Sequence, residues 1–241
     1  MIYGIIAAGE GSRLSNDGYQ GLKPMVSLNG ELMIDRLIEV FVENKAKSIH
    51  IIINEKSVDL KRHLDSLELA VPLKIIVKNT VSSLHSFHEL LLASPEIHEI
   101  CLTTTDTIFD KNEFKKYIDE FVFNKNLDGL LAVTSFIDDE SPLYVNYNNT
   151  LKILDIVDET DLDKPNVSGG IYCLRKRALE LVHLAIHQGL HRMRNFQRLL
   201  TDNKLLLDTY SFQKIMDVDH LSDIRKAEIF LKQVENRIIH E

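Results

Sequence analysis

The residues with the clearest chemical potential lie in the segment 7–24. This stretch begins AAGEGSRL at the end of the first apolar run of the chain and closes with Lys-Pro. Gly9 and Gly11 allow the backbone to turn tightly and to bring N–H groups against anionic oxygens. Arg13 and Lys23 add the positive charge that neutralises such oxygens. The pattern therefore predicts a loop that holds a phosphate chain at the end of a strand.

The order of these residues, Gly-x-Gly followed by Ser-Arg, matches neither the dinucleotide-binding pattern nor a Walker A loop. Together with Lys23-Pro24 and the segment 25–30, it resembles the signature of the nucleotidyltransferases that activate sugar 1-phosphates and related phosphomonoesters. The resemblance implies that Arg13 holds the leaving pyrophosphate and that Lys23 bridges the α-phosphate and the incoming phosphate. The loop residues implied to bind the nucleotide are Ala7, Ala8, Gly9, Gly11 and Ser12. The alternative is a tight turn with incidental basic residues, and in both cases the two side chains are expected on a solvent-facing loop.

Three aspartates far from this loop are the candidate metal ligands. Asp106 follows an apolar run and three threonines, at the expected carboxyl end of a strand, where open α/β sheets bind ligands. Asp217 and Asp219 follow the last predicted strand, and residues i and i+2 of an extended chain point to the same side. Both segments resemble family positions whose acidic residues hold Mg²⁺, a cation that prefers oxygen ligands. His220-Leu221 replaces the common Thr-Pro, which leaves open whether Asp217 or Asp219 is the main ligand; a cap or turn is the alternative role for each aspartate.

Two further segments carry the remaining candidate contacts. The segment 78–84 begins where a predicted strand ends and leads into a helix that Ser82 or Ser83 can cap. The segment 166–172 is similar to the family strand in which glycine admits the acceptor. The segment 157–160 stands where the family often has Glu-Lys-Pro, but it contains no lysine. The implied contacts are Asn79 and Ser83 to the nucleotide, and Gly169, Gly170 and Glu159 to the acceptor.

Composition limits the class of protein. The 241 residues include 44% hydrophobic and 27% charged residues, which are globular values. No apolar run approaches the roughly 20 residues of a membrane span, and no secretory signal pattern precedes the first strand, so we expect a cytoplasmic protein. The net charge of −8 argues against binding to a nucleic-acid backbone. Two isolated cysteines in apolar runs predict buried thiols rather than a metal site or a disulfide.

Three histidines, His183, His187 and His191, recur at four-residue spacing. Imidazoles at this spacing can share a helical face and bind zinc, but Gly189 interrupts the predicted helix before the third. The pattern therefore favours a solvated helix end.

Apolar patterns predict alternating strands and helices. The expected strands cover residues 3–8, 49–53, 73–77, 100–104, 129–135, 170–174 and 205–212, with a hairpin between 143 and 157 that turns at Asn148-Asn149. The expected helices cover residues 33–44, 57–66, 83–93, 113–123, 176–187, 192–201 and 221–238, the last with an apolar stripe for the core. These elements predict an α/β fold, Rossmann-like and three-layered (α/β/α), with a mostly parallel mixed sheet of the GT-A-like nucleotidyltransferase type. We expect one domain, 1–241, with a nucleotide-binding half of about 1–135 and an acceptor-binding half of about 136–241.

Residues and resemblance together predict a Mg²⁺-dependent enzyme that transfers a nucleoside monophosphate from a nucleoside triphosphate to a small phosphomonoester. A sugar 1-phosphate is the first candidate acceptor, phosphocholine or another alcohol phosphate the second, and a molybdenum cofactor a more distant one. A metal-dependent glycosyltransferase and a catalytically silent nucleotide-binding protein are the alternatives from other classes. The base, the acceptor and the oligomeric state, a homo-oligomer included, stay open.

Overall fold

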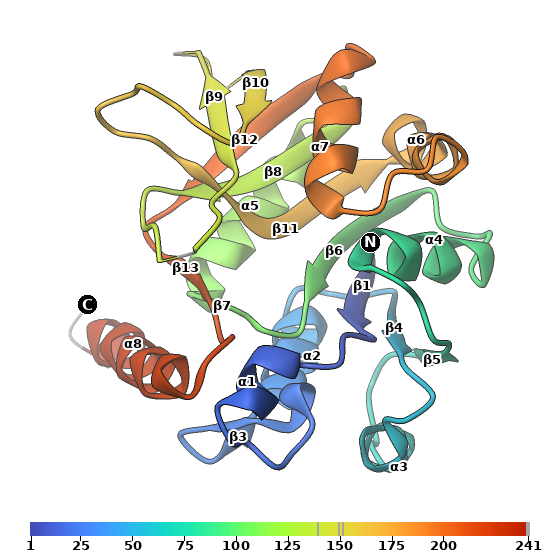
Figure 1. Cartoon of the computed structure of the whole chain (residues 1–241), viewed down its shortest axis with the longest axis vertical. Coiled ribbons are helices and arrows are strands. Elements are labelled where there is room, and N and C mark those ends of the chain that lie inside the picture. Colours follow the sequence, from blue (N-terminus) through green and yellow to red (C-terminus); the bar gives the residue numbers. More distant parts are fainter. Residues whose placement is uncertain (139, 149, 151, 240–241) are drawn as a thin grey trace.

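The computed structural model describes residues 1–138, 140–148, 150 and 152–239, and its centre is a nine-stranded sheet. The strands are β1 (Ile2–Ala7), β4 (Ser48–Ile53), β5 (Leu73–Val77), β6 (Glu99–Thr104), β8 (Gly129–Thr134), β9 (Tyr144–Tyr147), β10 (Ile153–Val157), β11 (Val167–Arg175) and β12 (Leu207–Phe212). The main order is β10-β9-β11-β6-β1-β4-β5, with β8 beside β11 and β12 beside β8. Parallel pairing joins β6, β1, β4 and β5, as the continuous apolar runs indicate. The antiparallel pair β6–β11 connects the two predicted halves in one sheet (Figure 1).

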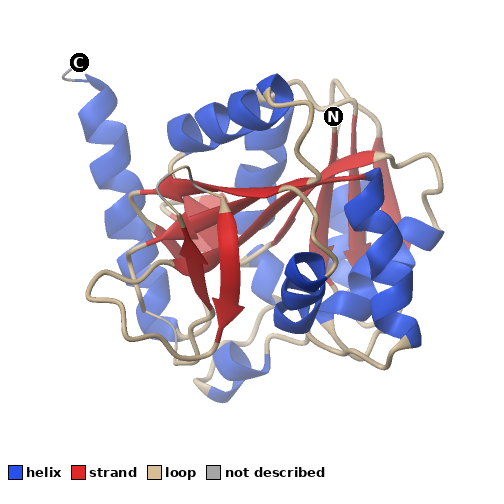
Figure 2. Cartoon of the chain, turned by 90° about the horizontal axis from the view of Figure 1, so that it is seen from above, coloured by secondary structure: helices blue, strands red, loops and turns tan. Residues whose placement is uncertain are grey.

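Helices lie on both sides of this sheet (Figure 2). They are α2 (Met33–Glu43), α3 (Val58–Asp65), α4 (Ser83–Leu92), α5 (Lys111–Phe123), α6 (Lys176–His187) and α7 (Met193–Asp202). Side chains alternate along β1, so that Tyr3 and Ile5 join one apolar cluster with α2, α3 and α5. Ile6 points the other way and joins a second cluster with α4, α6 and α7. The predicted three-layer α/β fold is confirmed.

Helix α8 (Leu221–Ile239) lies at the side of these layers (Figure 1). Its residues Ala227, Leu231 and Val234 belong to a third apolar cluster under the predicted phosphate loop. The core stripe predicted for this helix is therefore correct for these three residues and for Ile224, which is partly buried against the same cluster. Leu221 is exposed, and the side chain of Ile238 lies outside the described part. Although α8 spans 19 residues, neither it nor any other helix of the described chain combines the length and apolarity that a membrane crossing needs.

Several short elements were not predicted. The 3₁₀ turn η1 (Lys23–Met25) and helix α1 (Ser12–Asn16) follow the phosphate loop. Two small sheets pair β2 (Ser27–Leu28) with β3 (Glu31–Leu32), and β7 (Thr107–Phe109) with β13 (Ile215–Asp217). Segments of two to five residues are too short to carry a periodic pattern, which is why the sequence did not indicate them. The predicted hairpin is present as β9 and β10, while Asn149 of its turn lies outside the described residues.

The cysteines and histidines have partners on neighbouring elements. Cys101 and Cys173 are free, buried register partners on β6 and β11, as expected of buried thiols. His183 of α6 lies with a ring nitrogen 3.0 Å from one of His88 on α4, and the ring of His191 stacks on that of His85 at 5.3 Å between centroids. These contacts join two helices instead of grouping the three spaced histidines. In the part of the chain that the structure describes, no three His, Cys, Asp or Glu side chains are grouped to hold a metal ion.

Arg175, at the end of β11, caps the C-terminal end of α5. Its guanidinium donates to the carbonyl oxygens of Phe121, Asn124 and Leu127 at 2.6–2.8 Å, and its Nε donates to Glu99. Because Arg175 makes four charge-assisted hydrogen bonds here, including one to the Phe121 carbonyl in the last turn of α5, we expect Arg175→Met to lower the free energy of unfolding by about 3 kcal/mol in urea denaturation. The exposed neighbour Lys176→Met is the control, and its free energy of unfolding should stay within about 0.5 kcal/mol of the parent. Equal stabilities of the two variants would contradict this role of Arg175.

Candidate active site

The predicted phosphate loop and Asp106 meet at one edge of the sheet. β1 ends at Ala7, and its parallel neighbour β6 ends at Thr104. Gly11 has a φ of +63°, which glycine adopts without strain, and a Cβ atom there would lie 3.0 Å from Cβ of Lys23. Glycine is thus needed at this position both for the turn and for the approach of Lys23. At Gly9, in contrast, a Cβ atom would meet nothing within 4 Å.

Lys23 links two aspartates from distant segments. Its Nζ lies 2.5 Å from Oδ2 of Asp106 and 2.6 Å from Oδ1 of Asp219. The second oxygen of Asp219 accepts from Arg13, at 2.5 Å. The side chain of Lys23 is only 13% exposed, whereas that of Arg13 is 54% exposed. The expectation that both cations lie on a solvent-facing loop is therefore wrong for Lys23, because packing against Gly11 and the two carboxylates encloses it.

The charges of this cluster compensate one another. Burial alone would lower the pKa of the Lys23 ammonium, but Asp106 and Asp219 outweigh it and raise that pKa above its usual value. Burial likewise opposes ionisation of Asp106, yet Lys23 holds the pKa of this carboxyl below its usual value. One oxygen remains without a hydrogen bond among the described residues: Oδ1 of Asp106 is buried and unpaired. The cluster can therefore accept one more positively charged or hydrogen-donating group.

A cavity of about 830 Å³ opens on one side of this cluster. Its walls include the phosphate loop, the start of α4, Asp106 and Asp219. Of the predicted nucleotide contacts, those that line the cavity are Ala7, Ala8, Gly9, Gly11, Ser12 and Ser83. Ser82 caps α4, as one of the two serines was expected to do. Asn79 lies outside the lining, because its amide is exposed and pairs with Glu55.

Several residues that line this cavity were not among the predicted site residues. Polar examples are Thr80, Ser86, Thr104 and Arg192. Thr80 directly follows Asn79 within the segment 78–84, and Ser86 lies three residues after Ser83, so both are next to predicted positions. Arg192 comes from the loop before α7, and no local pattern connects it with the phosphate loop.

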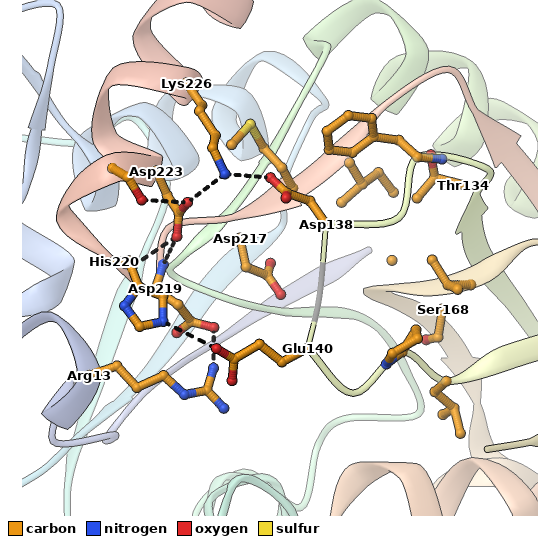
Figure 3. A pocket seen from close by; sticks show the side chains of 18 residues that line it. Arg13, Thr134, Asp138, Glu140, Ser168, Asp217, Asp219, His220, Asp223 and Lys226 are labelled. Carbon is orange, nitrogen blue, oxygen red and sulfur yellow. Dashed lines mark hydrogen bonds and ion pairs between the residues drawn. The ribbon is translucent and has the colours of Figure 1, made fainter. Parts of the chain in front are cut away.

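A second cavity, of about 270 Å³, lies on the other side of the cluster (Figure 3). It is formed by the end of β8, the loop after β8, the start of β11, β13 and the start of α8. Gly169 lines this cavity. A Cβ atom at Gly169 would lie 2.3 Å from Cδ1 of Ile215, so the group packed against this glycine is a side chain of the protein and not the acceptor. Gly170 has a φ of +73° and does not line the cavity. Glu159 is an exposed loop residue outside both cavities.

Asp217 stands apart from the other two aspartates. It lines the second cavity, at the end of β13 (Figure 3), whereas the Asp219 carboxylate contacts Arg13 and Lys23. The enclosing protein and the charges of Asp106 and Asp219 raise the pKa of Asp217 to about 8, although its side chain keeps contact with solvent in the cavity. In the structure, Asp106 and Asp219 therefore both contact the Lys23 ammonium, whereas Asp217 faces the second cavity.

A family model described as nucleotidyl transferase matches residues 4–233, a span that includes the phosphate loop and all three aspartates. The chain belongs to the nucleotidyl transferase family. As a member of this family it is an enzyme of the nucleotidyl-transferring class. A comparison with curated protein sequences gave no match.

Solved structures with the same fold include two that are named as nucleotidyl-transferring enzymes. The inositol-1-phosphate CTP transferase from T. maritima has a TM-score of 0.78 at 16% identity, covering 97% of this chain and 96% of that one. A putative glucose-1-phosphate thymidylyltransferase from Bacillus anthracis, solved in complex with a sucrose, has a TM-score of 0.80 at 19% identity and 95% coverage of both chains. HddC from Yersinia pseudotuberculosis has a TM-score of 0.73 at 16% identity, over 95% of this chain and 99% of that one. At these identities the likeness establishes the fold.

Proposed function

We propose that this nucleotidyltransferase transfers a nucleoside monophosphate from a nucleoside triphosphate to a small phosphomonoester. One observation carries the proposal: Arg13 and Asp219 line both cavities, so the cation and carboxylate cluster stands where the two adjoin. The larger cavity suits the triphosphate, since it contains the phosphate loop and the N-terminus of the ten-residue helix α4. The smaller cavity then takes the acceptor.

The reaction needs no protein nucleophile. An oxygen of the acceptor phosphate forms a bond to the α-phosphorus, and the bond between that phosphorus and the oxygen bridging to the β-phosphate breaks, so that pyrophosphate leaves. Catalysis comes from holding the two oxygens in line and from neutralising the charge between them. In this proposal Arg13 binds the leaving pyrophosphate. Lys23 bridges the α-phosphate and the acceptor phosphate.

The donor set also fits Mg²⁺, which we propose as the cofactor. Mg²⁺ is usually held by one or two carboxylates, several waters and substrate phosphates. Asp106 and Asp219 supply two carboxylates, which both contact the Lys23 ammonium. The buried Oδ1 of Asp106 has no hydrogen-bond partner in the described structure. When bound, the metal would supply positive charge to the phosphate oxygens. Asp217 remains a candidate third ligand.

A sugar 1-phosphate is the first candidate acceptor, and the names of two fold neighbours, which act on inositol 1-phosphate and glucose 1-phosphate, support it. A specific observation favours a second candidate, an alcohol phosphate that carries a positive charge, such as phosphocholine. Asp217 and Glu140 line the acceptor cavity, and neither has an ion pair with a lysine or arginine in the described part of the chain. An acceptor with a cationic group would pair with Glu140 and would favour the ionised form of Asp217, whose pKa is raised to about 8.

The test is a panel that pairs CTP, UTP, GTP, dTTP and ATP with sugar 1-phosphates and with phosphocholine, scored by pyrophosphate release. We expect one triphosphate and one class of acceptor to give turnover that depends on both substrates. Nucleoside diphosphate release from a sugar nucleotide would identify a glycosyltransferase instead. Triphosphate binding without any turnover would identify a silent binding protein. Since the substrates are phosphorylated metabolites and both cysteines are free, we also propose that the protein works in the cytoplasm.

A further inference from the structure

The N-terminus of α8 is fixed to the helix that carries Arg13. Asp17, the residue that ends α1, accepts hydrogen bonds through Oδ2 from the backbone N–H of Leu221 at 3.1 Å and from Nδ1–H of His220 at 2.9 Å. These partners are 203 and 204 residues away in the chain. One carboxylate oxygen therefore connects the end of the phosphate loop with the two residues that directly follow Asp219.

This contact replaces a cap that the local sequence does not supply. His220 stands at the N-terminal boundary of α8 and has no side-chain oxygen to accept from the free amides of the first turn. Asp223 accepts from the amides of Asp219 and His220, at 3.2 and 2.9 Å, and the amide of Leu221 is left to Asp17. The cap of α8 is thus shared between its own first turn and helix α1.

The consequence concerns the place of Asp219. On its N-terminal side, the amide of buried Val218 donates to the carbonyl of Asp106 at 3.1 Å. On its C-terminal side, Asp17 holds the next two residues. Asp219 is therefore held between the turn that carries Asp106 and the helix that carries Arg13, and its carboxylate contacts Arg13 and Lys23.

We propose that Asp17 is a positioning residue for the metal site, acting through His220 and Leu221 to keep the Asp219 carboxylate close to Asp106. This inference rests on the proposed function, in which Asp106 and Asp219 bind Mg²⁺. Partners that orient metal ligands typically contribute about 10- to 100-fold to metal affinity. Asp17 itself contacts neither substrate cavity.

The experiment measures binding of Mn²⁺ to the full chain, without nucleotide, from the electron paramagnetic resonance signal of the free ion. We expect Asp17→Ala to raise the Kd for Mn²⁺ about tenfold or more. Asp17→Asn keeps an oxygen for the Leu221 amide but loses the charge opposite His220, so its Kd should fall between those of the parent and Asp17→Ala. The matched control is Asn29→Gly, which removes the hydrogen bond from Asn29 Nδ2 to Glu228 in the middle of α8 and suits the φ of +54° at that position. Its Kd should equal that of the parent.

The outcomes separate the two proposals. If the parent binds Mn²⁺, Asp106→Asn does not, and Asp17→Ala binds as the parent does, then the role of Asp17 is wrong and the metal site stands. If the parent itself does not bind Mn²⁺, the metal site fails and the role of Asp17 fails with it. An increase of Kd in Asn29→Gly equal to that in Asp17→Ala would show that any loosening of α8 weakens the site, and would also overturn the inference. Should Asp17→Ala not fold, a parental Kd in Asp17→Asn overturns it in the same way.

Discussion

Lys23→Met is expected to reduce pyrophosphate release by about 10²-fold or more, because it removes a charged group from the proposed transition state. It is also expected to destabilise the metal-free protein. The Lys23 ammonium lies between Asp106 and Asp219 with little exposure, so its loss leaves a buried carboxylate without a counter-charge. Breaking such a pair costs about 3 kcal/mol in the free energy of unfolding. Both effects are measurable, one by a pyrophosphate assay and the other by urea denaturation.

Arg13→Met is the matched control for this prediction. Its side chain is 54% exposed and contacts only Asp219 in the described structure, so the free energy of unfolding should change by no more than about 0.5 kcal/mol. Its turnover should nevertheless fall by about 10²-fold, since Arg13 is proposed to bind the leaving pyrophosphate. Normal turnover in both variants would show that the phosphate loop has been assigned wrongly. Equal stability of the two variants would contradict the difference in burial.

Removal of divalent metal is expected to abolish pyrophosphate release, and added Mg²⁺ to restore it. Without a metal, Arg13 and Lys23 alone would face the charges of the triphosphate and of the carboxylates that they already contact. Asp106→Asn should lower turnover by about 10²-fold even in excess Mg²⁺, since a neutral amide is a poor metal ligand. Full activity in excess chelator would refute the metal site. Asp59→Asn, an exposed carboxylate on α3, is the control and should behave as the parent.

The sequence and the structure lead to different predictions for the free energy of unfolding of Asp106→Asn. From the sequence, three neighbouring carboxylates without partners predict that removing one charge preserves or raises the stability of the metal-free protein. In the structure Asp106 is paired with Lys23, so we expect the free energy of unfolding to fall by about 1–2 kcal/mol instead. Urea denaturation in chelator decides between the two.

The sequence by itself determined the fold class and the place of the glycine-containing loop that we propose binds phosphate. Both depend on local signals: continuous apolar runs such as the one in β4, apolar residues at helical spacing in α2, and glycines beside basic residues at the end of β1. Asp106 was placed correctly past a strand for the same reason, because the carboxyl edge of a parallel sheet follows from the pattern of its strands. These features require only a few neighbouring residues.

Only the tertiary structure decided how the site is completed. It showed that Lys23 is enclosed, that Asp219 rather than Asp217 meets Asp106 on that lysine, and that Asn79 and Glu159 lie outside the cavities. The direction of a side chain in a short irregular segment depends on what packs against it, and here the partners are as many as 206 residues away. A local pattern carries no information on such contacts. The amide of Leu221 illustrates this, because the carboxylate that accepts from it belongs to a helix at the opposite end of the chain.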